Sequence, residues 1–432
     1  MSEYPDVGKR RKNLLEGFFL LLISSIFLYP LFALDRIKNI LALRINGVTT
    51  NNSIWIIPLV CFFSFLIIKR PREGFNRRIL RRVLEFLFPL LIVILLGGFR
   101  SSSSRQFLYS FMVLLVPVFV FFLMGYAGIK HFKFFVKLFV IVCAFYSIFA
   151  IILTTNYWYF MRLLGNPLEY RYYYQFRARM MLGSSITVGY YLNLTIPFCF
   201  YLLSTSKEIK YRVLSLVALV ASIIANLVLL SRANAFTTFA IIAIYLFFFK
   251  RGRRLFLRKL VFIILLLVVG YYVLGSFNLD RLFIRVGYGD DIIRINSMRL
   301  GIHIFTKYPI IGSGLGTYFL RAYTDRWIAV DGISGLVDPH NVYILLLSET
   351  GLLGVVFLLG VFVTILKGFS KIREYELRFT SYMVMLAFLI GGIGGSHLVN
   401  EINFSIVFWY YLGLLISQAR IPNQETYARE VN

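Results

Sequence analysis

Long apolar runs separated by short polar or basic segments recur along the whole chain. Most runs hold about 17 to 25 residues with few internal charges, the length with which an α-helix crosses about 30 Å of hydrocarbon. The two-residue alternation typical of a membrane β-barrel is missing from these runs. We therefore expect an all-α polytopic membrane protein. The runs predict twelve spanning helices, at residues 14–34, 54–68, 83–99, 107–127, 132–153, 186–203, 213–230, 233–249, 260–276, 341–366, 379–396 and 403–417.

The predicted spans divide the chain into three parts. Residues 1–276 hold nine helices with short links, residues 277–340 form a long loop, and residues 341–432 hold three helices and a tail. Inside the loop, two sets of residues recur at helical spacing, which predicts an amphipathic helix. The apolar set is Ile295, Met298, Ile302 and Phe305, and the basic set is Arg299, His303 and Lys307. Pro309 and a cluster of glycines predict the turn that ends this helix.

Composition and charge fit a protein that lies in lipid. Of the residues, 59% are hydrophobic and 15% charged, against roughly 45–50% and 25% in soluble domains. A net charge of +26 would suggest a nucleic-acid partner in a soluble protein, but here the basic residues cluster between apolar runs. The side of the N-terminus carries 29 of the 46 lysines and arginines. Because positive charge marks cytoplasmic loops, we expect both termini in the cytoplasm, large outer loops at 154–185 and 277–340, and no nucleic-acid partner.

Four arginines are candidates for binding an anion on the outer side. Arg232 lies between two closely spaced spans, where a guanidinium faces protein, water or an anionic ligand, or else reaches out to lipid headgroups. Arg177 and Arg179 end the first outer loop, and Arg299 lies on the amphipathic helix. Planar guanidinium groups bind phosphates with two parallel hydrogen bonds, so these residues could form a diphosphate clamp. The alternative for each one is a solvated basic loop.

One histidine stands out as a candidate base. His340 directly follows Pro339 at the predicted start of the tenth span, which fixes an imidazole at the membrane surface. An imidazole with an ordinary pKa near 6.5 removes a proton from a hydroxyl near neutral pH. The alternative is that His340 only caps the helix or binds interfacial water. His303 and His397 are weaker candidates on the same side.

Acidic residues and cysteines give no sign of a metal site. The aspartates of the outer loop are scattered, and Asp290-Asp291 is more typical of a solvated turn. Cys61, Cys143 and Cys199 lie in apolar runs without paired spacing, so we expect them to pack as small buried hydrophobes. Glu349 lies about 13 Å below the start of its span and needs a partner, either a structural hydrogen bond or a proton relay.

The stretch from His340 to Gly354 resembles the motif of the O-antigen ligase and polymerase family, with its His-Asn pair, leucines and Glu-x-Gly element. Upstream, Ser231-Arg232 is similar to the family's Ser-Arg element. Arg299 followed by Pro309, Gly312, Gly314 and Gly316 is similar to its Arg, Pro, Gly-x-Gly segment. The three elements occur in order over residues 225–360, whereas the region that contains Arg177 and Arg179 is a looser match.

This resemblance implies a metal-independent, inverting glycosyltransferase of the GT-C kind in the bacterial inner membrane, with no cofactor. Its donor would be a glycan linked by diphosphate to undecaprenol, and its acceptor a lipid A-core hydroxyl in the periplasm. His340 would then deprotonate the acceptor, while Arg232, Arg299 and either Arg177 or Arg179 would hold the departing diphosphate.

Two other functions remain open. An O-antigen or exopolysaccharide polymerase of the same family would extend one lipid-linked repeat with another. A secondary transporter would also fit twelve spans with both termini inside, although we find no similarity between the two halves of the sequence. The basic outer loop favours the ligase, because it suits a phosphorylated core acceptor.

Overall fold

The computed structural model of the protein describes ten main segments of the chain. They are residues 77–99, 104–155, 168–171, 175–178, 185–229, 231–248, 290–318, 320–321, 339–395 and 402–419; nearer the start it describes residues 17, 20, 21, 23–25, 27, 28, 44, 45, 48 and 49. The predicted spans 54–68 and 260–276, and most of 14–34, lie outside these residues.

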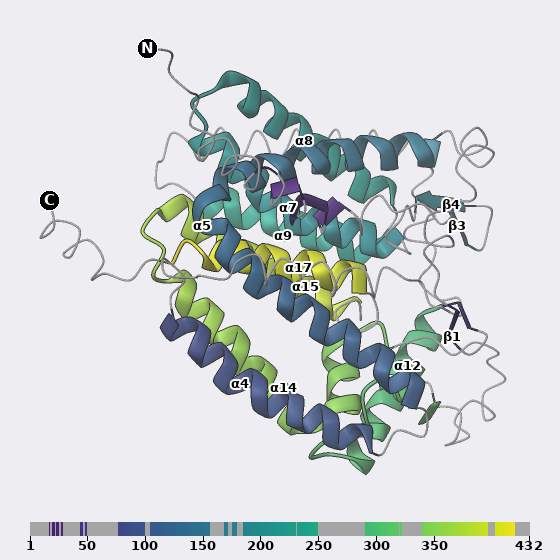
Figure 1. The fold of residues 1–432 in the computed structure, drawn as a ribbon. Coiled ribbons are helices and arrows are strands. Elements are labelled where there is room, and N and C mark those ends of the chain that lie inside the picture. The colour runs from purple at the N-terminus through teal and green to yellow at the C-terminus, as the bar shows by residue number, and fades with distance from the viewer. Residues whose placement is uncertain are drawn as a thin grey trace, which may run out of the picture.

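Helices occupy the other predicted spans. They are α4 (Arg77–Gly98), α5 (Ser104–Thr155), α7 (Ser185–Thr205), α8 (Ile209–Val228), α9 (Arg232–Phe248), α14 (Val342–Phe369), α15 (Tyr375–Ile393) and α17 (Ile402–Ile416). A further helix, α12 (Asp290–Lys307), forms in the long loop as predicted. The helices lie side by side as a bundle (Figure 1).

Five helical stretches in this part of the chain are long and apolar enough to cross a membrane. They are Leu114–Thr154, Ile186–Thr205, Ile209–Val228, Val342–Phe369 and Tyr375–Ile393. The first has 41 residues, about 60 Å of helix and so twice the thickness of a hydrocarbon core. At His131 the backbone leaves helical geometry, with φ −112° and ψ 18°. α5 is therefore two helices joined at a bend, where the sequence predicts the link between two spans.

Two short hairpins are the β-structure of the described residues, and the all-helical expectation missed both. β1 (Arg44–Ile45) pairs with β2 (Val48–Thr49), and β3 (Leu168–Arg171) pairs with β4 (Gln175–Ala178), each antiparallel. β3 and β4 lie within the predicted outer loop 154–185, and β4 contacts α5 and α7. The hairpins belong to links between spans, so the spanning part remains helical.

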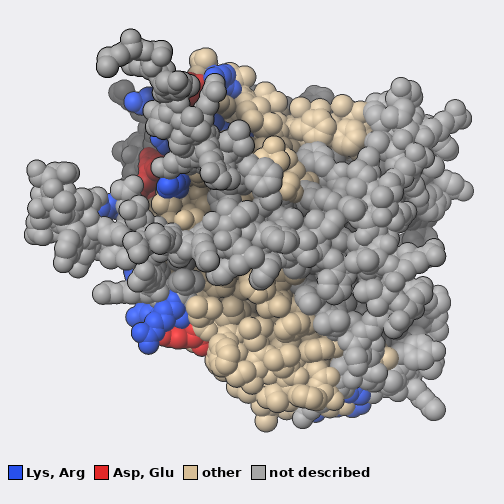
Figure 2. All heavy atoms as spheres, viewed as in Figure 1, with Lys and Arg blue, Asp and Glu red and all other residues tan. Residues whose placement is uncertain are grey.

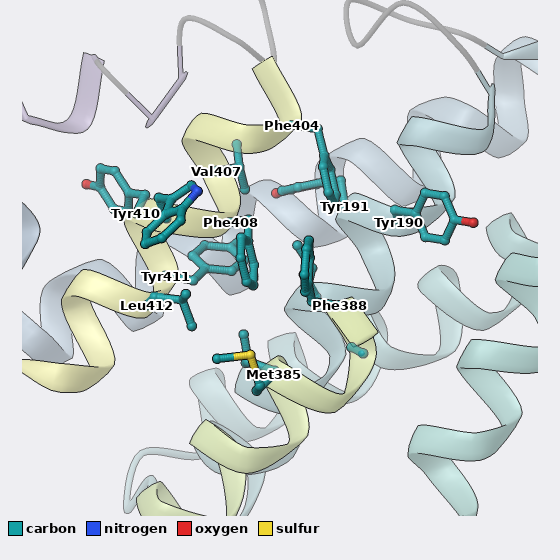
Figure 3. Packing of buried hydrophobic residues seen from close by; sticks show 14 of the residues in the cluster. Tyr190, Tyr191, Met385, Phe388, Phe404, Val407, Phe408, Tyr410, Tyr411 and Leu412 are labelled. Atoms are coloured by element: carbon teal, nitrogen blue, oxygen red, sulfur yellow. The ribbon is translucent and has the colours of Figure 1, made fainter. Parts of the chain in front are cut away.

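α17 is the centre of the core. It is apolar on every side, a pattern typical of a helix enclosed by other helices. Trp409, Tyr410 and Tyr411 are almost completely buried, and α17 packs most extensively on α5. The ring of Phe408 stacks on Phe388 of α15 with a centroid distance of 3.9 Å, in the cluster shown in Figure 3.

The cysteines that the structure describes behave as predicted. Cys143 on α5 and Cys199 on α7 are buried free thiols. The Cys143 Sγ lies 3.1 Å from the hydroxyl of Ser222 on α8. Cys61 lies outside the described residues.

One end of the bundle, which we call the charged end, collects ion pairs. It comprises the bend of α5 near His131, the link between α7 and α8, and the link between α14 and α15. Lys137 and Lys210 both pair with Glu208, at 3.5 and 2.9 Å. In the face shown in Figure 2, most of the coloured lysines and arginines lie toward the left, beside a broad uncharged surface. The opposite end, which we call the loop end, comprises residues 229–232, 308–318, 339–342 and 393–395.

Candidate functional site

The start of α14 is held firmly at the loop end. Asn341 caps the helix, because its side-chain oxygen accepts hydrogen bonds from the backbone N–H groups of Tyr343 and Ile344, at 3.0 and 3.1 Å. The Asn341 Nδ2 donates to the carbonyl of Ile393 at the end of α15, at 3.3 Å. The hydroxyl of Tyr343 donates to a second carbonyl of α15, that of Leu389, at 2.6 Å.

His340 occupies an unusual backbone conformation directly before this cap. Its φ is +45°, the one positive value among the described residues other than glycine. For a residue with a Cβ, this region costs roughly 1–2 kcal/mol. Strain of this kind clusters at functional sites, where the surrounding contacts hold it in place. The imidazole is half-buried.

The start of α9 lies against the same turn of α15. The Ser231 hydroxyl accepts a hydrogen bond from the Asn234 N–H at 3.4 Å, and Arg232 is the first residue of the helix. A Cβ added to Gly394 would lie 2.5 Å from the Cβ of Ala233, so the two backbones touch. The residues next to Arg232 and His340 in the chain therefore both contact the turn Ile393–Gly394 at the end of α15.

α12 packs on the first turn of α14. Gly301 packs on Ile344, since a Cβ at this glycine would lie 2.5 Å from the Ile344 side chain. Arg299, two residues earlier, has an exposed side chain. These contacts place the starts of α9 and α14, and with them the backbones of Arg232 and His340, at the loop end, and α12 with Arg299 lies beside the first turn of α14. The structure describes the Arg299 and His340 side chains but only the backbone of Arg232.

The apolar residues predicted on α12 do not face the core of the protein. Ile295 and Ile302 are 51% and 52% exposed, whereas Leu300 and Ile304 are 4% and 0% exposed and pack into the core. Both sets recur at helical spacing. Hydrophobic periodicity identifies an apolar face, but it does not say whether that face meets protein or the surroundings.

Of the two candidates in the first outer loop, Arg177 and Arg179, the structure describes one, and of that one only the backbone. Arg177 lies on β4, opposite Glu169 of β3 in the hairpin register. Arg179 lies outside the described residues, as does His397. The rival His303 lies on α12 and is half-buried.

The expected continuous helix over 341–366 is wrong at one point, because α14 breaks at Gly351. That glycine has φ +65°, ψ −171°. The segment 308–318, which follows α12, enters the break. Its backbone takes over the interrupted helical hydrogen bonds at four places: Ser313 N to Ser348 O (3.0 Å), Gly314 N to Glu349 O (3.0 Å), Leu352 N to Pro309 O (2.8 Å) and Leu353 N to Ile310 O (3.1 Å).

The glycines predicted to end α12 make this insertion possible. Gly312, Gly314 and Gly316 all have positive φ, between 72° and 108°. A Cβ at Gly312 would lie 2.3 Å from the backbone of Glu349, and one at Gly314 would lie 2.6 Å from the Gly97 carbonyl of α4. The segment is therefore wedged between α4 and α14, at a distance that only glycine allows.

A buried amide network lies beneath Arg232, and sequence reasoning missed it. The Asn193 Oδ1 on α7 accepts from the Asn226 Nδ2 of α8 (3.2 Å) and from the Thr238 hydroxyl of α9 (2.6 Å). The Asn234 Nδ2 donates to the Ile186 carbonyl at 2.9 Å. Three asparagines inside apolar spans were the available signal, since polar side chains in such spans hydrogen-bond between helices.

An apolar hollow lies directly under the His340–Asn341 turn. It is small and lies where α7, α14, α15 and α17 meet, with Tyr190, Phe388 and Phe404 among its lining residues (Figure 3). Within the described part of the chain, no group of three or more His, Cys, Asp or Glu residues could hold a metal ion.

These features define an integral membrane protein built from apolar helices, with a polar, glycine-rich site at one end of the bundle. Residues 217–359 match the family model described as O-antigen ligase, the same part of the chain in which the motif resembles that family. The match contains Arg232, Arg299 and His340, but not Arg177 or Arg179. A comparison with the curated proteins finds no match.

Proposed function

We propose that this protein is an O-antigen ligase-type glycosyltransferase that moves a glycan from undecaprenyl diphosphate to a lipid A-core hydroxyl. The observation that carries the proposal is the packing of the family's three elements around one end of the bundle. The starts of α9 and α14 both contact the end of α15, and α12 packs on the first turn of α14. In this proposal the loop end faces the periplasm, both termini are cytoplasmic, and the protein has a GT-C-like arrangement in the bacterial inner membrane.

The chemistry assigned to each residue follows from its type. His340 takes the proton from the acceptor hydroxyl, which attacks the anomeric carbon and inverts it. Arg232 and Arg299 neutralise the diphosphate that departs, so the reaction needs no metal. Arg177 and Arg179 belong to the proposal only if the outer hairpin folds over the bound donor.

A polymerase of the same family would use the same residues, so an experiment in cells is needed to distinguish the polymerase from the ligase. Deletion of the protein in its native host distinguishes them. Lipopolysaccharide without any O-chain, together with accumulated long lipid-linked polymer, supports the ligase. Lipopolysaccharide that carries a single repeat supports the polymerase and rules out the ligase.

One observation favours a transporter: a spanning helix broken beside a buried acid is common in secondary transporters. In those folds the freed carbonyls bind the ion. Here the carbonyls of Ser348 and Glu349 already accept hydrogen bonds from residues 313 and 314. Purified protein in vesicles without any ion gradient provides the test. We expect transfer of glycan from the lipid-linked donor to the acceptor, and gradient-dependent movement of the lipid without transfer would contradict the proposal.

A further inference from the structure

Glu349 lies at the junction between the broken helix and the inserted segment. It precedes the break at Gly351 by two residues, and only 3% of its surface is exposed. A carboxyl group buried to this degree inside an apolar span needs hydrogen-bond partners. The proposed chemistry does not use it.

The partners of this carboxyl are backbone groups of the inserted segment. The Oε1 accepts a hydrogen bond from the N–H of Tyr318 at 3.1 Å, and the backbone of Gly316 also interacts with the carboxyl group. The Oε2 has no hydrogen-bond partner among the described residues. Losing the acceptor of a buried backbone N–H leaves that group unpaired, so this contact adds to the four backbone bonds of the insertion whatever the charge of the carboxyl.

The same segment is tied to α12. The Tyr318 hydroxyl donates to the carbonyl of Ser297 on that helix at 2.7 Å. A chain of contacts therefore runs from Glu349 through Tyr318 to the part of α12 that carries Arg299. Glu349 also lies on the same helix, α14, whose N-terminal cap directly follows His340.

We propose that Glu349 is a positioning residue whose carboxyl oxygen holds residues 308–318 in the break of α14 and so fixes Arg299 relative to His340. We call this contact between Glu349 and residues 308–318 the carboxyl clamp. The roles of Arg299 and His340 rest on the proposed function, whereas the carboxyl clamp does not.

Two substitutions of Glu349 distinguish the effect of side-chain length from the effect of charge. Glu349→Gln keeps an oxygen at the same distance from Gly316 and Tyr318 but removes the charge. Glu349→Asp keeps the charge but withdraws the oxygen by one methylene. A clamp needs reach, whereas a proton relay or an ion site needs the ionisable group. Ser348→Ala is the matched control, because the Ser348 hydroxyl bonds only within its own helix, to the Leu345 carbonyl at 2.8 Å.

Hydrogen–deuterium exchange of the full chain in lipid nanodiscs measures the clamp without any glycan substrate. In peptides covering residues 308–321, we expect Glu349→Gln and Ser348→Ala to exchange within about twofold of the wild type. We expect Glu349→Asp to exchange about tenfold faster or more, which corresponds to the loss of one strong hydrogen bond. Wild-type exchange in folded Glu349→Asp, or fast exchange in Glu349→Gln, would overturn the proposal. If the aspartate variant does not fold, the glutamine result decides alone.

The transfer assay then tests the consequence for the site. Glu349→Gln should retain turnover and Glu349→Asp should lose it in proportion to the opening of the segment. An opened segment with full turnover would overturn the link to Arg299 and His340. Absence of transfer in the wild type would refute the proposed function and leave the exchange result standing.

Discussion

The two ends of the helix bundle terminate their helices by different means. At the charged end, α8 and α15 begin after Glu208 and Glu374, neither of which forms a side-chain cap, and the ion pairs lie in the open. At the loop end, Asn341 caps α14 with two hydrogen bonds and three glycines allow backbones to touch. Exposed charges tolerate rearrangement because water replaces each lost contact. Buried, close-packed backbone does not tolerate rearrangement. Substitutions at the loop end should therefore have much larger effects on stability and activity than substitutions at the charged end.

The largest effect on stability is expected from Gly312→Ala. The φ of +72° and the Cβ contact of 2.3 Å with the Glu349 backbone leave no room for a methyl group, and backbone atoms cannot rotate away. We expect the free energy of unfolding to fall by about 2–5 kcal/mol, from left-handed strain plus overpacking. Chemical denaturation in detergent measures this. The control is Gly17→Ala, where nothing lies within 4 Å; equal stability of the two variants would mean that the insertion is not tight.

Replacing Arg299 with lysine should affect transfer rather than stability. The side chain is exposed, but an ammonium group cannot grip a diphosphate with two parallel hydrogen bonds. We expect transfer to slow about tenfold. Arg81→Lys at the charged end, where the side chain is 84% exposed, is the control and should keep full activity. Similar rates for both variants would remove Arg299 from the site.

The amide network should give a smaller effect. Asn193→Leu leaves Asn226 and Thr238 without their shared acceptor, which should lower the unfolding free energy by about 1–2 kcal/mol. Thr364→Val is the control, because the Thr364 hydroxyl bonds only to the Gly360 carbonyl of its own helix. If the control is as unstable as Asn193→Leu, the bonds between helices contribute nothing extra.

The smallest effect is expected at Glu208. The hydrogen bond from Lys210 lowers the pKa of the Glu208 carboxyl. A lowered pKa contributes stability above the unfolded pKa, and that contribution disappears as the pH falls through the folded pKa. Because the group is fully exposed, Glu208→Gln should melt at the wild-type temperature at neutral pH, and even the slightest difference should vanish in acid. A large decrease at neutral pH would contradict the contrast between the two ends.

Within the described residues the sequence predicted where the helices of the bundle form, because the apolar runs are long and bounded by polar or charged residues. It also predicted the turn after α12 from Pro309 and the glycines. It could not predict that this turn inserts into α14, because Gly351 within an apolar run is compatible with an unbroken helix. The insertion depends on contacts between segments that lie far apart in the chain.

The candidate site was also predictable only in part, because it too depends on contacts between segments that lie far apart in the chain. Arg299 and His340 stood out through residue type and through the family motif, and the packing of α12 on α14 brings them to one end. The amide network around Asn193 and the clamp at Glu349 did not stand out. A polar residue in an apolar run indicates that a hydrogen-bond partner is needed. Which residue is the partner depends on how the helices pack, and the sequence does not show this.

We propose that His340, whose backbone is strained, carries out proton transfer at the loop end. The variant His340→Gly tests it most directly, because glycine accepts the positive φ without the penalty of a Cβ. Turnover of lipid-linked glycan and unfolding free energy should be measured on the same purified sample. We predict that transfer falls about 10²- to 10⁴-fold while stability is unchanged or higher. Full transfer by a stable His340→Gly protein would contradict the account.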